Sequence, residues 1–403
     1  MAQPYTLTRD ALILDLHAAF QCAKRHKANK AYVQHFERHL QTNIEQLADD
    51  LLNHTYQAEP STVFVVQYPK KREVFAAQFR DRVVHHLYYN YTHELFERTF
   101  IADSYSCIEG RGTHYGIERL KQHIRQESHN YQRPCWVMRM DKRGYFMHID
   151  RQLLLSITLR TLERMSRHRI SHGHPLTWGQ WIDIPFIKWM SREIIMLDPR
   201  QHCRMVGTEA DWDGLDHSKS LFHTADGCGL PIGNLTSQLL SNVYLNEFDQ
   251  YCKRELGCKH YGRYVDDSFI VSSDRQWLLS LVPRIRQFLS DKLHLELHMG
   301  KLHITSASYG AEFLGGYIKP YREYISTQAL HRIKQHVDAL NIRHPEQAAA
   351  SIGSILAVLG HYASYNIRAQ LFTTNAMRSA FNFNRQLSTV NPRPYFTRLL
   401  DSI

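Results

Sequence analysis

The chain has 403 residues, enough for a large hydrophobic core and two or three subdomains. Hydrophobic residues make up 43% of it and charged residues 22%, which argues against a disordered chain. The net charge of +10, with 26 His in addition, predicts a positive field that attracts polyanions in a salt-dependent way, although many globular proteins are mildly basic.

The cysteines are also informative. There are seven of them, an odd number, scattered without a Cys-x-x-Cys pair. This distribution argues for reduced thiols in a cytosol and against a zinc knuckle or a disulfide framework. Residues 1–9 lack a basic start followed by an apolar core, and no apolar run reaches membrane-spanning length. We therefore predict a cytoplasmic protein with no membrane partner.

The first part of the chain has a helical pattern. Apolar residues recur at helical spacing within residues 8–56, which predicts an N-terminal helical segment covering residues 1–60. Basic side chains between residues 24 and 30 are candidates for nucleic-acid contact, although a solvated helix face is the commoner explanation of such a cluster.

Residues 61–91 change character. Residues 61–68 predict a strand, residues 69–73 a basic turn and residues 74–76 a returning strand, and a helix begins near Arg80. A basic hairpin followed by a helix suits a triphosphate, because Lys and Arg neutralise the charge of an incoming nucleotide. By residue type alone, the hairpin is equally compatible with a surface turn.

Two apolar stretches, far apart in the sequence, carry acids. Residues 136–140 predict a strand that ends at Asp141, and residues 260–273 predict a hairpin with Asp266 and Asp267 at its tip. Adjacent like charges are unfavourable unless a cation neutralises them, and hard oxygen ligands suit Mg²⁺. Two-metal phosphoryl transfer requires carboxylates from separate strands. These three acids supply such a set, although an Asp-Asp dipeptide by itself is more often a solvated turn.

A loop rich in Gly and Pro leads into a helix within residues 227–248. We expect Thr236 or Ser237 to cap this helix and a buried stripe to run along it. Residues 151–222 contain a predicted helix at 153–165 but little recognisable chemistry. The remaining predictions are a helix at 277–289, a strand at 293–298, a glycine-containing hairpin at 313–320 and helices at 330–340, 347–359 and 367–371.

The strand before Asp141, the block at residues 227–248 and the sequence Tyr264-Val-Asp-Asp resemble, in that order, motifs A, B and C of reverse transcriptases. The resemblance extends from about Val63 to Arg368. It implies an α+β right-hand polymerase fold with fingers, a palm containing an antiparallel catalytic sheet, and a helical thumb. The implied limits are residues 61–135 for the fingers, 136–324 for the palm with an insertion at about 165–222, and 325–403 for the thumb and C-terminal tail.

The resemblance implies an RNA-directed DNA polymerase that uses two Mg²⁺ ions, which Mn²⁺ can replace. Arg72 falls at the position of a triphosphate-binding arginine, and Phe146 at that of an aromatic residue that excludes a ribose 2′-hydroxyl. Lys301 falls near a lysine that protonates pyrophosphate. A core aromatic and a solvated lysine are the alternatives for the last two. The implied catalytic and metal-binding residues are Asp141, Asp266 and Asp267; further nucleotide-binding residues are Ile232, Gly233 and Gln238; template- or primer-binding residues are Arg111, Tyr264, Gly315 and Gly316.

Residues 232–238, Ile-Gly-Asn-Leu-Thr-Ser-Gln, are similar to those of reverse transcriptases from diversity-generating retroelements. Most retroviral and intron enzymes have Gln in place of Ile232 and Pro in place of Gln238. The resemblance implies error-prone copying of a dedicated RNA template into cDNA from dNTPs, with a small basic accessory protein or a second element-encoded protein as partner. The alternatives are an antiphage-defence reverse transcriptase with its own non-coding RNA, and a non-catalytic, maturase-like RNA-binding protein. Ile232 either relaxes nucleotide selection, because it cannot donate an amide hydrogen bond, or packs under the loop.

Overall fold

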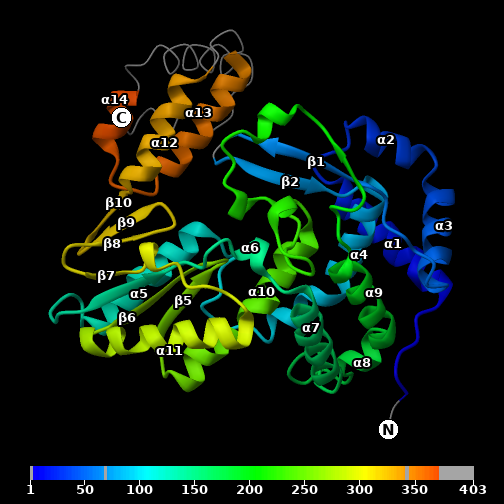
Figure 1. The fold of residues 1–403 in the computed structure, drawn as a ribbon, viewed down its shortest axis with the longest axis horizontal. Coiled ribbons are helices and arrows are strands. Elements are labelled where there is room, and N and C mark those ends of the chain that lie inside the picture. Colours follow the sequence, from blue (N-terminus) through cyan, green and yellow to red (C-terminus); the bar gives the residue numbers. More distant parts are fainter. Residues whose placement is uncertain (1–2, 68–69, 341–344, 372–403) are drawn as a thin grey trace. The chain divides into compact units, whose positions relative to one another are not determined.

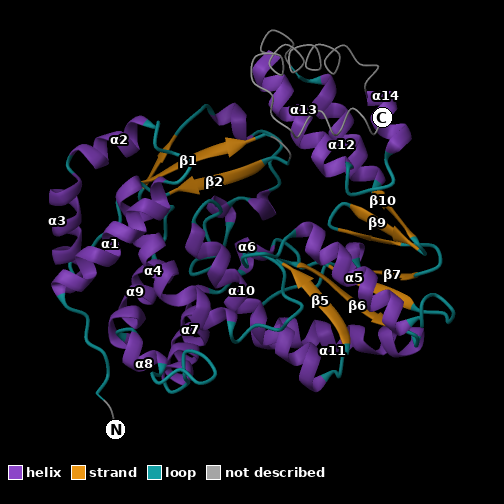
Figure 2. Ribbon diagram, turned by 180° about the vertical axis from the view of Figure 1, so that it is seen from behind, coloured by secondary structure: helices purple, strands orange, loops and turns teal. Residues whose placement is uncertain are grey.

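The computed structural model describes residues 3–67, 70–340 and 345–371, with the element order drawn in Figure 1. The chain divides into two compact units. The first comprises residues 1–112, 139–270 and 276–303, and the second comprises residues 113–138, 271–275 and 304–403. Helices and sheets occur in both units, which confirms the predicted α+β class (Figure 2).

The predicted N-terminal helices are confirmed. Thr8 caps the first of them, because its side chain accepts a hydrogen bond from the Ala11 N–H. Leu12, Leu16 and Phe20 are fully buried on the inner face of this helix. The helices of this region are α1 (Arg9–Lys24), α2 (Ala31–Arg38), α3 (Leu40–Leu52) and α4 (Phe79–Glu97), and α1 packs against α3 and α4.

The predicted basic hairpin is also present. Strand β1 (Ser61–Val66) pairs antiparallel with β2 (Arg72–Ala76), and β1 pairs parallel with the short strand β4 (Cys203–Met205). Val63 and Phe75 face the same side of this sheet and are buried. The strand β4 comes from the stretch for which the sequence suggested little, and it extends the hairpin into a three-stranded sheet.

The middle of the first unit is helical. Helices α7, α8 and α9 lie next to one another (Figure 1). Asp150 begins α7 by accepting a hydrogen bond from the Leu153 N–H. The elements are α6 (Tyr145–His148), α7 (Arg151–Ser166), α8 (Trp178–Trp181), α9 (Ile184–Met196) and the 3₁₀ turns Glu209–Trp212, His217–Lys219 and Leu221–His223.

Helix α10 (Leu235–Gln250) is buried on most of its surface and continues into a π-helical turn at Tyr251–Glu255. The expected capping by Thr236 or Ser237 is wrong. The helix begins after Asn234, so both side chains lie inside its first turn. The Thr236 hydroxyl instead hydrogen-bonds Nδ1 of His85 at 2.8 Å. A helix surrounded by protein on most sides needs such partners for its polar residues.

A four-stranded sheet carries the acids of the sequence analysis. Its order is β5-β6-β3-β7, and β5 and β6 form the predicted hairpin. The expected strand at residues 293–298 is wrong: the helix before it continues to the buried Leu293, and only Leu297 forms an isolated bridge, with Lys142. The elements are β3 (Trp136–Met140), β5 (His260–Tyr264), β6 (Asp267–Ser272), α11 (Arg275–Leu293), a 3₁₀ turn at Met299–Lys301 and β7 (His303–Ser306).

The second unit contains a small sheet and the C-terminal helices. The predicted hairpin at residues 313–320 turns through Leu314 and Gly315, whose φ angles are 50° and 87°. Apolar residues of the helices form a local core that includes Val337, Ile352 and Leu359. The elements are α5 (Thr113–Glu127), β8 (Ala311–Phe313), β9 (Gly316–Lys319), β10 (Arg322–Ile325), α12 (Thr327–Asp338), α13 (Pro345–Leu359) and α14 (Tyr365–Leu371).

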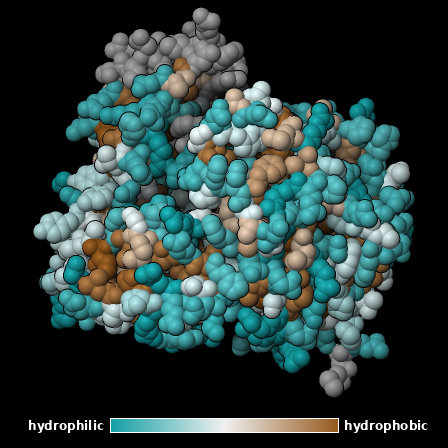
Figure 3. Space-filling view, in the orientation of Figure 1, coloured by the Kyte–Doolittle hydropathy of each residue, from teal (hydrophilic) through white to brown (hydrophobic). Residues whose placement is uncertain are grey.

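The surface is polar on the face drawn in Figure 3, where hydrophilic residues predominate and apolar residues occur in smaller areas. Within the described residues, no helix combines the length and apolar character needed to cross a membrane. The predicted C-terminal tail lies outside the described residues from position 372 onward.

Candidate active site

The turn between β5 and β6 carries the adjacent acids. Tyr264 is the half-buried last residue of β5, Val265 and Asp266 form the connection, and Asp267 begins β6. Val265 has φ 53°, a left-handed conformation that β-branched residues rarely adopt. The sequence analysis placed Asp266 and Asp267 at the tip of the hairpin, whereas the structure places the unusual φ at the preceding valine.

Asp141 directly follows β3 and is 7% exposed. Its Oδ2 pairs with the ammonium of Lys301. Its Oδ1 is buried and has no hydrogen-bond partner among the residues that the structure describes. A buried carboxylate oxygen without a donor is costly, and a bound cation would satisfy it.

The acids perturb one another. Burial, followed by the charges of Asp267 and Asp141, raises the pKa of Asp266 to about 7. Burial and Asp141 raise the pKa of Asp267 as well, although part of that side chain is open to solvent. The hydrogen bond to Asp141 raises the pKa of Lys301. Mutual repulsion of this kind is expected where several carboxylates lie close together at a cation-binding site.

The donor set suits Mg²⁺, because carboxylate oxygens are its preferred protein ligands. In the described part of the chain, however, no group of three or more His, Cys, Asp or Glu side chains is arranged to hold a metal ion. One oxygen of Asp141 is engaged by Lys301 instead. The structure therefore brings the three predicted acids into one electrostatic cluster without assembling them into a finished metal site.

Two buried cations lie beneath the turn. Lys142 Nζ donates to the Asp266 carbonyl at 2.9 Å and to Ser268 Oγ at 2.8 Å. Arg263 Nη1 donates to the Val265 carbonyl at 2.9 Å. Burial, and then the charge of Arg263, lowers the pKa of Lys142 to about 8. The sequence analysis overlooked both cations, although a charged residue within an apolar strand or directly after one is a signal for a buried partner.

The β1–β2 hairpin is attached to the insertion through Glu73. This side chain is 1% exposed and lies beside the exposed Arg72. Its carboxylate accepts hydrogen bonds from Trp212 Nε1 at 2.9 Å, Ser220 Oγ at 2.9 Å and the Leu221 N–H at 2.6 Å. The sequence analysis missed Glu73, because its partners are about 140 positions away. This contact fixes the strand on which Arg72 stands.

Phe146 and Ile232, both predicted to contact the nucleotide, are half-buried in one apolar cluster. The buried members of the cluster are Val63, Phe75, Met147 and Leu221. The Ile232 carbonyl also accepts a hydrogen bond from the Phe75 N–H at 2.9 Å. The cluster therefore joins the Gly-rich loop to the hairpin. These direct contacts of Ile232 support the alternative in which it packs under the loop.

Gly233 follows in the same loop with φ 128°. A Cβ at this position would lie 2.8 Å from the Phe75 carbonyl oxygen and 2.9 Å from Val74 Cγ1. No side chain fits at that distance from a backbone oxygen. The glycine is thus required by both its conformation and its approach to β2.

The other predicted contacts lie elsewhere. Gln238 is exposed on α10 and accepts a hydrogen bond from Cys107 Sγ at 3.5 Å. Arg111 Nη1 donates to the carbonyls of Ala102 and Ser104, so this predicted template contact also braces its own loop. Gly315 and Gly316 belong to the second unit, where a Cβ on Gly316 would lie 3.0 Å from Ile117.

Comparison with known proteins identifies similarities over most of the chain. The family model described as "Reverse transcriptase (RNA-dependent DNA polymerase)" matches residues 69–318. Protein YkfC of Escherichia coli (strain K12) is 26% identical over 310 residues, which cover 68% of this chain and 71% of that protein.

Solved telomerase structures show weaker similarity. A Candida albicans telomerase in complex with a telomeric RNA fragment has 8% identity and a TM-score of 0.45, with 71% of this chain covered. An apo telomerase from Candida tropicalis has 9% identity and a TM-score of 0.46, with 80% of this chain covered. The chain spans 51% and 61% of the lengths of these two telomerase chains.

The close approach of Gly233 generates a stability prediction. Gly233→Ala should reduce the free energy of unfolding by about 3 kcal/mol or more, because the strained φ and the close contact with β2 both oppose a Cβ. Gly227→Ala is the matched control, since Gly227 has φ 74° but a Cβ added there would meet nothing within 4 Å. Urea unfolding measures both variants, and equal losses would contradict the contact with the hairpin.

The raised pKa of Asp266 generates a second prediction, for the protein in EDTA. A carboxyl whose folded-state pKa exceeds its unfolded value of about 3.9 destabilises the fold as it ionises. This cost is absent below about pH 3.9 and complete above a folded-state pKa of about 7. Asp266→Asn should therefore melt a few degrees above the wild type at about pH 8, with a smaller gap at about pH 5. A gap independent of pH would argue against the raised pKa.

Proposed function

Because the chain belongs to the reverse transcriptase (RNA-dependent DNA polymerase) family, we propose that it extends a nucleic-acid 3′ end on an RNA template with dNTPs. The observation that carries this proposal is the cluster of Asp141, Asp266 and Asp267, in which burial and then the neighbouring carboxylate charges raise the pKa of the two turn acids. The family match covers all three acids, the Gly-rich loop and most of the predicted fingers and palm, in keeping with the right-hand polymerase fold expected from the sequence.

The three acids are the proposed ligands of two Mg²⁺ ions. Asp141 offers a buried oxygen that lacks a donor among the described residues, and Asp266 and Asp267 offer oxygens from the turn. When bound there, Mg²⁺ would supply Lewis-acid activation of the 3′-hydroxyl and charge neutralisation at the leaving pyrophosphate. Until then, the Lys301 ammonium offsets the charge of Asp141. Lys301 would have to leave that carboxylate for a metal to take both of its oxygens.

The nucleotide is proposed to lie between the acids and the β1–β2 hairpin. Arg72 is exposed at the start of β2, where its guanidinium is available to pair with a triphosphate. Phe146 is held by the apolar cluster beside the Gly-rich loop, a rigid support for a ring that would exclude a 2′-hydroxyl. The apolar cluster thus links Phe146, the proposed sugar contact, to the hairpin that carries Arg72, the proposed triphosphate contact.

The biological role that we propose is error-prone copying of a dedicated RNA template. The sequence of residues 232–238 supports it through its similarity to the enzymes of diversity-generating retroelements, whereas the packing of Ile232 among apolar residues is the competing explanation for that residue. Without an amide at this position, the loop lacks one hydrogen bond that would favour a correctly placed nucleotide. RNA template, cDNA product and a small basic or second element-encoded protein are the proposed partners. Sequencing of the RNA that copurifies with the protein distinguishes a repeat template from the non-coding RNA of a defence system.

The catalytic proposal predicts the effect of a neutral substitution. Asp266→Asn should reduce primer extension on an RNA template with Mg²⁺ and dNTPs by at least about 10³-fold, because a metal ligand loses its charge. Asp291→Asn makes the same chemical change at an exposed position of α11 and should retain wild-type activity. Near-normal extension by a folded Asp266→Asn protein would refute the assignment.

The proposed role of Ile232 predicts a change in errors. Ile232→Gln should lower misincorporation several-fold, most visibly opposite template adenine, and keep total synthesis within a few-fold. Ile232→Val is the control for packing, since it remains apolar and should preserve the error spectrum. Sequencing of cDNA made by all three proteins on one adenine-rich RNA measures the effect. Identical spectra for the wild type and Ile232→Gln would sink the hypothesis.

A further inference from the structure

Val265 has a strained backbone conformation next to the proposed active-site acids. Its φ of 53° is unfavourable for a β-branched side chain, and it directly precedes Asp266. A conformation of this kind persists only where the surrounding structure imposes it. The question is therefore which contacts hold the turn.

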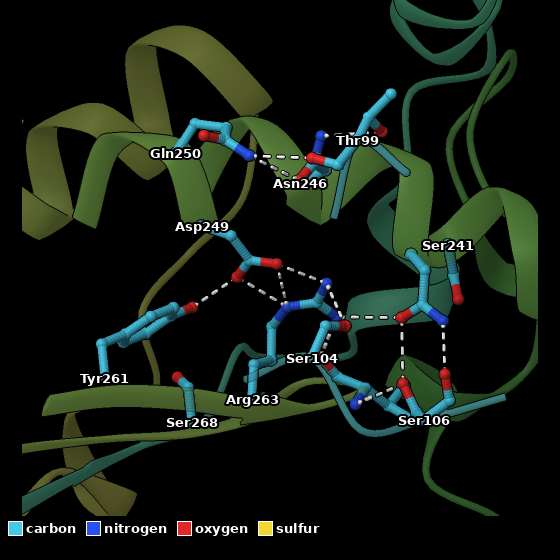
Figure 4. A network of polar contacts seen from close by, with 12 residues as sticks. Thr99, Ser104, Ser106, Ser241, Asn246, Asp249, Gln250, Tyr261, Arg263 and Ser268 are labelled. Carbon is cyan, nitrogen blue, oxygen red and sulfur yellow. Dashed lines mark hydrogen bonds and ion pairs between the residues drawn. The ribbon is translucent and has the colours of Figure 1, made fainter. Parts of the chain in front are cut away.

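Arg263 provides the first contact. It is fully buried and paired with Asp249 of α10, which is also fully buried, and Figure 4 shows the carboxylate between Arg263 and Tyr261. Nε and Nη2 donate to the Asp249 oxygens at 2.7–3.0 Å. Because the ion pair fixes the orientation of the guanidinium, Nη1 remains directed at the Val265 carbonyl, 2.9 Å away.

Ser106 provides the second contact, from a separate loop. Its Oγ accepts the Val265 N–H at 3.1 Å and donates to Asn242 Oδ1 at 2.9 Å. The same Asn242 oxygen accepts from Arg263 Nη1 at 3.0 Å. Both peptide groups of Val265 are therefore tied to α10 through one asparagine.

Lys142 provides the third contact, from the segment after β3. Its ammonium holds the Asp266 carbonyl and Ser268 Oγ, and it lies 4.9 Å from the centre of the Phe248 ring. A buried ammonium is costly unless its donors are satisfied. Its hydrogen bond therefore holds the carbonyl of Asp266, as that of Arg263 holds the carbonyl of Val265.

We propose that Arg263, Ser106 and Lys142 are positioning residues that hold the Val265–Asp266 turn in its strained form, so that the Asp266 carboxylate is presented before a metal ion binds. The inference rests on the proposed polymerase function, because it assigns a purpose to the turn of that same site. A positioning role differs from a merely structural one in its readout. It predicts a loss of metal affinity in the folded protein without nucleic acid.

The test uses the full chain and Mn²⁺ binding measured by electron paramagnetic resonance. Ser106→Ala removes both the acceptor of the Val265 N–H and the donor to Asn242, and it should weaken Mn²⁺ binding about fivefold, since the Val265 N–H loses its partner in the competent state. Ser106→Cys, with a weak sulfur acceptor and similar volume, is the second variant if the first does not fold. Gln250→Ala is the control, because it removes the hydrogen bonds that the Gln250 amide donates to the Thr99 carbonyl and to Asn246 of the same helix, and none at the turn.

A double-mutant cycle makes the test specific to strain. Glycine adopts a positive φ without cost, so in Val265→Gly the surrounding contacts should no longer be needed to impose the turn conformation. In that background, Ser106→Ala should change Mn²⁺ affinity less than about twofold. Equal losses in both backgrounds, or an equal loss in Gln250→Ala, would overturn the positioning role. Absence of Mn²⁺ binding by the wild type would overturn the proposed function itself, which separates the two failures.

Discussion

The buried ion pair between Asp249 and Arg263 determines how helix α10 meets the β5–β6 hairpin. Neither charge is exposed, and either one left alone would cost several kcal/mol. The helix therefore cannot slide along the strand without breaking the pair. Since Tyr264 and the acidic turn follow Arg263 directly, the register of this one contact fixes where the acids stand. The Gly-rich loop at the other end of α10 is placed by the same constraint.

The two ends of α10 thus contact two parts of the proposed site. Its first residues follow the loop in which Ile232 and Gly233 contact β2. Its later residues hold Arg263. A helix buried on most of its surface transmits position between these ends with little freedom to rotate. The proposed nucleotide contacts and the proposed metal ligands are separated in the sequence but are set by one rigid element.

The sequence was sufficient to predict elements whose signal is local. The strand before Asp141, the acidic hairpin and the basic hairpin each have apolar periodicity and a distinct end, and all three are present. The hydrogen-bond partner of the Val265 N–H and the partners of Glu73 lie more than a hundred positions away, so local patterns do not reveal them. The strand predicted at residues 293–298 was wrong for a related reason. Leu293, the first residue of that segment, is buried as the last residue of α11.

The attachment of Glu73 to the insertion restricts how such enzymes can be recombined. Three donors, from Trp212, Ser220 and Leu221, converge on this one buried carboxylate. A chimera that kept the hairpin and replaced residues 208–223 by a short loop would strand the charge in an apolar setting, at a cost of a few kcal/mol. The hairpin and the insertion therefore form one exchangeable module, and grafting either alone into a relative would require Glu73 to change with it.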